Sequence, residues 1–166
     1  MTEAFLPTTD ELINRARADL RMGVPVVLTG HGTSALVLAA ETAGPDRLAA
    51  LRGLGGQPVL AIAGRRAETL KARAYDGDVA RLPLPDEADC AWVRGIADPA
   101  DDLRMPMKGP LFALRDGDAA LHRLAISLIK SAQLLPAALV LENNVVGFPD
   151  VDLLTRLDAE SAGPYL

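Results

Sequence analysis

The chain has 166 residues and a formal net charge of −5, which fits one domain, residues 1–166. Its basic residues do not cluster, which argues against nucleic-acid binding, and its one cysteine, Cys90, excludes an internal disulfide and a Cys-rich zinc site. No apolar run approaches the ~18 residues that span a bilayer, and no secretory signal is visible. We therefore expect a cytoplasmic protein without a membrane partner.

The first forty residues predict a helix, a strand, a loop and a further element. Thr8 and Glu11 have the spacing of a capping box, and Gly23 is suited to end the helix that follows them. The apolar run 24–28 predicts a buried strand. Residues 29–34 form a loop by composition, and 35–40 fit either a second strand or the start of a helix.

The middle of the chain is less regular. Pro45 is well placed to begin a helix through Leu54, residues 58–63 predict a strand, and 65–72 predict a short helix. Five prolines interrupt residues 75–110, so we expect an irregular, Pro-rich crossing there with one helix over 88–97.

The last third carries the clearest pattern. A strand is predicted over 111–114, and Asp116 to Asp118 supply a turn and a helix cap. Apolar residues three or four positions apart then form one helical stripe from Leu121 to Leu135, which Pro136 ends. A buried strand over 137–141 leads to Glu142. Strands separated by helices predict an α/β fold, a mixed sheet with helices packed on it.

The order of these segments resembles dihydroxybutanone phosphate synthase, the riboflavin-pathway enzyme that makes a four-carbon unit. The resemblance implies that enzyme's fold, together with a homodimer. Five stretches carry it: 17–28, 36–41, 58–70, 112–115 and 134–142.

The chain departs from that family where the chemistry is expected. The family has a long acidic loop that supplies magnesium ligands, whereas residues 29–34 contain no carboxylate. The family's Thr-Gly segment has no counterpart in 98–110, and His122 falls one position late for the catalytic histidine. Glu142 alone matches a family site residue. We therefore expect no catalytic residue and no metal site here, with magnesium relevant only if the ancestral activity survives.

A narrower resemblance links the opening Leu20 to Val26 and the segment 134–139 to a divergent N-terminal domain of some bacterial GTP cyclohydrolase II proteins. It implies a non-catalytic accessory or dimerisation domain of a riboflavin-biosynthesis protein. Zinc would then belong only to a separate C-terminal cyclohydrolase domain, and this chain would hold no cofactor. Two alternatives stay open: a regulatory module that binds a sugar phosphate or nucleotide, and a residual dihydroxybutanone phosphate synthase.

Each candidate ligand-binding residue also has a structural interpretation. The loop that begins at Gly30 could hold an anion, but a tight turn is favoured. His122 could be a displaced base, but an exposed or half-buried helical residue is favoured. Glu142 could bind a ligand at a strand end or simply cap the strand. The candidate residues are Gly30, His31, Gly32, Thr33, Ser34, Arg115, His122 and Glu142.

Overall fold

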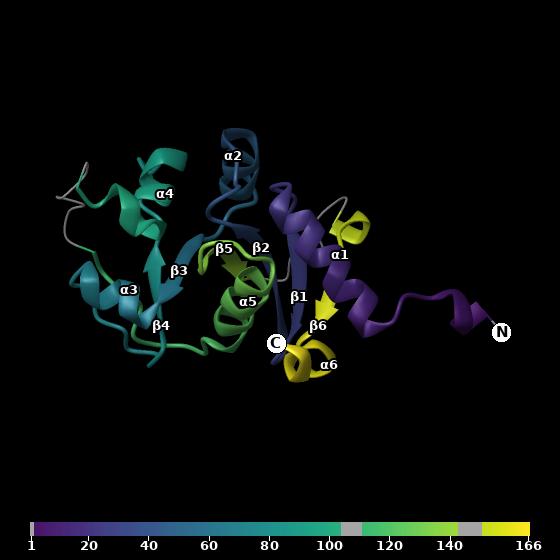
Figure 1. The fold of residues 1–166 in the computed structure, drawn as a ribbon. Helices are drawn as coiled ribbons and strands as arrows, with labels where there is room; N and C mark the ends of the chain where they lie inside the picture. The colour runs from purple at the N-terminus through teal and green to yellow at the C-terminus, as the bar shows by residue number, and fades with distance from the viewer. Residues whose placement is uncertain (1, 104–110, 143–150) are drawn as a thin grey trace.

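A six-stranded mixed sheet forms the centre of the molecule (Figure 1). The computed structural model describes residues 2–103, 111–142 and 151–166. The strand order is β4-β3-β5-β2-β1-β6, and all neighbours are antiparallel except β1 and β6, which are parallel. The predicted α/β fold class is confirmed. The strands are β1 (Val26–Gly30), β2 (Thr33–Ala39), β3 (Val59–Ala63), β4 (Val79–Pro83), β5 (Ala137–Glu142) and β6 (Arg156–Asp158).

Helices cover both faces of this sheet (Figure 1). Helices α1 (Thr9–Arg21), α5 (Ala120–Ser131) and α6 (Ala159–Ala162) share one hydrophobic core with the sheet. Helices α2 (Pro45–Gly53), α3 (Gly64–Thr69) and α4 (Cys90–Ala97) form the core on the opposite face. Within the described residues, no helix combines the length and the apolar character needed to cross a membrane.

The start of α1 follows directly from its sequence. The Thr8 side chain accepts a hydrogen bond from the Glu11 backbone amide, and the Glu11 carboxylate accepts one from the Thr8 amide, so the predicted capping box is present. Three residues at helical spacing, Ile13, Ala16 and Leu20, are buried against the sheet. Gly23 follows the helix with a φ of 78°.

The loop predicted after the first strand is a two-residue turn. Strand β1 runs to Gly30 and β2 begins at Thr33, so only His31 and Gly32 connect them. Both have positive φ, at 53° and 77°, as a type I′ hairpin turn requires. The favoured interpretation as a tight turn is therefore confirmed. Residues 35–40, predicted to be either a second strand or the start of a helix, belong to strand β2 up to Ala39.

The irregular crossing predicted for 75–110 is wrong over 79–83. These residues form β4, which pairs with β3 and alternates its side chains between the two cores. A charged residue, Arg81, in the middle of the run and the prolines at 83 and 85 masked the strand pattern. The predicted helix over 88–97 is confirmed as α4, and 104–110 lie outside the described residues.

The strand predicted for 111–114 is also wrong. These residues form no strand, although the Leu114 amide donates to the Arg81 carbonyl at 2.8 Å and so lies beside β4. Helix α5 ends at Ser131, five residues before Pro136, because Gln133 adopts a φ of 66° that no helix continues through. The last predicted strand is confirmed as β5.

Candidate functional site

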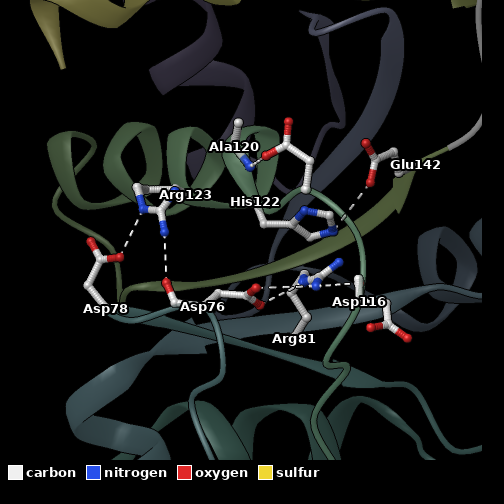
Figure 2. Close-up of polar contacts among 9 residues, drawn as sticks. Asp76, Asp78, Arg81, Asp116, Ala120, His122, Arg123 and Glu142 are labelled. Atoms are coloured by element: carbon white, nitrogen blue, oxygen red, sulfur yellow. Dashed lines mark hydrogen bonds and ion pairs between the residues drawn. The ribbon is translucent and has the colours of Figure 1, made fainter.

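A cluster of polar side chains lies between the first turn of α5 and the sheet (Figure 2). His122 comes from α5, Glu142 from the end of β5 and Arg81 from β4. Side chains alternate along a strand, so Arg81 shares a face with Val79, and Glu142 shares one with Val140. Both valines belong to the core under α5, so the three polar residues converge on one face of the sheet.

His122 is buried, with 2% of its surface exposed, which contradicts the favoured prediction of an exposed or half-buried position. The buried face of α5 is wider than the predicted stripe. It includes a second row, His122, Ile126 and Ile129, beside Leu121, Ala125 and Leu128. His122 Nε2 lies 3.9 Å from a Glu142 carboxylate oxygen. Its Nδ1 has no hydrogen-bond partner within the described part of the chain.

Burial sets the protonation of this pair. Burial lowers the pKa of His122 from 6.5 to about 4; the neighbouring Arg81 charge also lowers this pKa, while Asp76 and Asp118 raise it. Burial also raises the pKa of Glu142, against the lowering effect of Arg81. His122 is therefore neutral at pH 7, and its contact with Glu142 is not a pair of opposite charges.

Arg81 supplies the buried positive charge of the cluster. It is 4% exposed, and its Nε and Nη2 donate to both carboxylate oxygens of Asp76 at 2.8 and 3.3 Å. Nη2 also donates to the backbone carbonyl of Asp116 at 2.7 Å. Arg81 thus joins β4 to two segments, the turn before it and the loop that precedes α5.

Arg123 and Asp118 make further polar contacts at the start of α5. Arg123 donates to the carboxylate of Asp78 and to the carbonyl of Asp76, both at 2.8 Å (Figure 2). Asp118 accepts a hydrogen bond from the Ala120 amide at 2.9 Å, but the N-cap residue of α5 is Ala119, so the predicted cap lies one residue later than Asp118. The other carboxylate oxygen of Asp118 lies 3.7 Å from His31 Nδ1, which links the hairpin turn to α5.

The structure brings together only some of the predicted candidates. His122 and Glu142 are in contact, and His31 contacts Asp118, whose charge raises the pKa of both His122 and Glu142. Ser34 is not part of this group: Ala35 pairs with Glu142 and shares its face, so the adjacent Ser34 points to the other side of the sheet. Its buried Oγ lacks a hydrogen-bond partner in the residues that the structure describes.

Arg115 also lies apart from the cluster. Its guanidinium stacks over the Tyr75 ring, 5.0 Å from the centroid. The residues that sequence reasoning missed are Arg81 and Asp76, because the strand that carries Arg81 went unrecognised. Residues 79–83 show no apolar–polar alternation, so no local pattern in the sequence signals this strand.

One sequence relative covers most of the chain. No protein-family model matches this chain. The chain is 32% identical over 143 residues to a GTP cyclohydrolase-2 from Azospirillum brasilense, a match that covers 83% of this chain and 37% of that protein. The chain therefore spans little more than a third of the curated relative it matches.

Solved structures with the same fold are 3,4-dihydroxy-2-butanone 4-phosphate synthases. The enzyme from Candida albicans superimposes with a TM-score of 0.67 at 15% identity, covering 92% of this chain and 96% of that one. A two-domain enzyme from A. baumannii gives 0.59 at 17% identity, covering 96% and 57%. A structure in complex with two magnesium ions gives 0.54 at 16% identity and covers 96% of each chain.

The residues present here do not fit magnesium, which needs a near-octahedral set of oxygen ligands. Asp76 is bound to Arg81, Asp118 accepts a hydrogen bond from the Ala120 amide, and Glu142 supplies a single carboxylate. Across residues 2–103, 111–142 and 151–166, no group of three or more His, Cys, Asp or Glu residues could hold a metal ion. The chain is a divergent domain with the 3,4-dihydroxy-2-butanone 4-phosphate synthase fold, related in sequence to a GTP cyclohydrolase-2.

Proposed function

We propose that this chain is a non-catalytic accessory domain of a cytoplasmic riboflavin-biosynthesis protein, a GTP cyclohydrolase II. The sequence relative supports the identity of the parent protein, and the solved neighbours support the inherited fold. Its role is to associate two subunits as a homodimer or to position a separate cyclohydrolase domain. That separate domain, and not this chain, would bind zinc.

One observation carries the proposal: the two buried charges of the polar cluster under α5, Arg81 and Asp76, are bound to each other. Abstracting a proton next to a carbonyl requires a placed base and a cation that stabilises the enediolate. Here the buried cation is Arg81, whose donors bind Asp76 and the Asp116 carbonyl. The two-residue turn at His31 and Gly32 brings no carboxylate to the cluster.

Comparing GTP hydrolysis by two proteins tests this role. A longer protein containing this chain and a cyclohydrolase domain should hydrolyse GTP, whereas residues 1–166 alone should not. The same 166-residue chain, incubated with ribulose 5-phosphate and magnesium, should release no formate. GTP hydrolysis or formate release by residues 1–166 would reject the proposal. Sedimentation equilibrium tests the association role, for which a dimer of the 166-residue chain is expected.

The unpartnered Nδ1 of His122 favours a second candidate, a small-molecule-binding regulatory module. A buried polar atom without a partner is costly unless a water or ligand satisfies it. Calorimetry with ribulose 5-phosphate, GTP or a flavin should then show binding that His122→Leu abolishes. If none of these compounds gives heat at millimolar concentration, the regulatory role is wrong and the structural role remains.

A further inference from the structure

Arg81 gathers three oxygen atoms around one buried positive charge. Two belong to the carboxylate of Asp76 and the third is the backbone carbonyl of Asp116, forty residues further along the chain. Collecting oxygens from separate segments is the structural work that a bound divalent cation does. We infer that the guanidinium of Arg81 is a built-in cation that organises this cluster in place of a divalent metal ion.

The position of Arg81 in the fold supports this role. Its backbone lies in β4, where it pairs with Ala61 of β3, and its carbonyl accepts the Leu114 amide. Its side chain reaches the Asp116 carbonyl just before α5. One residue therefore connects the sheet, the turn at Asp76 and the approach to α5. Because the side chain is 4% exposed, water does not screen these contacts.

The charge of Arg81 also extends across the whole cluster. Arg81 lowers the pKa of both His122 and Glu142, which come from α5 and from the end of β5 (Figure 2). The other charged groups that act on this pair are Asp76 and Asp118, both acidic. Arg81 is therefore the cation that balances these carboxylates.

A divalent ion and Arg81 would compete for the same oxygens. Both oxygens of Asp76 already accept hydrogen bonds from the guanidinium, and the Asp76 side chain is only 10% exposed. A metal ion would have to displace the guanidinium or bind beside a like charge in a poorly solvated site, and either arrangement is unfavourable. The domain should therefore fold and remain stable without any divalent metal.

Thermal unfolding of the 166-residue chain tests this inference. The midpoint Tm should be the same in EDTA and in millimolar MgCl2 or MnCl2. Arg81→Gln leaves the Asp76 carboxylate buried without its partner and should lower Tm by roughly 10 °C, while Arg81→Lys, which keeps the charge, should recover part of that loss. A higher wild-type Tm with either metal, or a lower one in EDTA, would overturn the inference.

Arg123 provides the matched control. It also bonds an aspartate through Nε at 2.8 Å, but its side chain is 44% exposed and its partner Asp78 is 71% exposed. Arg123→Gln should shift Tm by no more than about 2 °C, because an exposed ion pair contributes little. An equal loss of Tm in both variants would show that Arg81 has no special role.

A second measurement separates the effect of the charge from a packing effect. The His122 imidazole, followed by NMR, should titrate at higher pH in Arg81→Gln than in the wild type, and Arg81→Lys should return it toward the wild-type value. If Arg81→Gln does not fold, Arg81→Gln with Asp76→Asn removes both buried charges and should fold. An unchanged His122 titration in folded Arg81→Gln relative to the wild type, or in the double variant relative to Asp76→Asn alone, would contradict the inference. None of these measurements depends on GTP hydrolysis, so they fail or succeed separately from the accessory role.

Discussion

His122 is an imidazole that the fold keeps uncharged. Burial under α5 lowers its pKa to about 4, whereas the unfolded chain restores the ordinary value near 6.5. Between these two pH values the unfolded state binds more protons than the native state. Stability therefore falls as the pH is lowered through this window and is fully present above pH 6.5, with a total effect of roughly 3 kcal/mol.

We predict that His122→Leu removes this component of the pH dependence. Urea unfolding at several pH values between 7 and 4 should show the wild type losing more free energy of unfolding than the variant, by roughly 2 to 3 kcal/mol. Glu142 acts in the opposite direction, because a raised carboxyl pKa favours the native state as the pH falls, but it is present in both proteins. His31→Gln, at the exposed turn, is the control and should follow the wild type. Parallel curves for His122→Leu and wild type would contradict the prediction.

Helix α4 depends on one buried arginine from α3. Arg66 is 9% exposed and donates to the carbonyls of Gly95 and Ile96 at 3.1 and 2.6 Å, near the end of α4. It also makes a bidentate pair with Asp102, with both contacts at 2.7 Å. The guanidinium therefore satisfies carbonyls that the helix end leaves without a backbone donor.

We predict that Arg66→Met lowers the free energy of unfolding by roughly 3 kcal/mol, because it removes the bidentate ion pair with Asp102 and the guanidinium donors of the helix-end carbonyls. The adjacent Arg65 is exposed, so Arg65→Met should change stability by no more than about 0.5 kcal/mol. Guanidinium chloride unfolding of both variants measures the difference. Similar losses for the two neighbours would show that the Arg66 contacts do not stabilise α4.

Local patterns predicted the elements well wherever one signal dominated. The capping box at Thr8, the apolar stripe of α5 and the run of β5 were all visible in the sequence. Strand β4 was not, because a charged side chain interrupts its apolar residues, and that side chain is stabilised by Asp76 and by the Asp116 carbonyl, which is distant in the sequence. The same partners define the cluster, so failing to predict β4 also left Arg81 out of the predicted site.

At the scale of the whole molecule, the sheet depends on a strand that comes late in the chain. Strand β5 lies between β2 and β3, and Val140 pairs with Val37 on one side and with Val59 on the other. These pairings join residues about eighty to one hundred positions apart, so little of the sheet can form from local contacts alone. Without β5, the hairpin β1-β2 and the antiparallel pair β3-β4 would have no strand between them.

We predict that a chain ending at Gln133 does not fold, although it retains four of the six strands. Two separate two-stranded pairs are at best marginally stable in water, and the apolar side of α5 that packs on β5 would lose this cover. Circular dichroism should show no cooperative thermal transition for residues 1–133. The matched control removes residues 1–7, where Phe5 and Leu6 are exposed and outside the core, and should keep a Tm close to that of the 166-residue chain. A cooperative transition for residues 1–133 would mean that one of the two halves folds independently, and that β5 completes the sheet without being required for it.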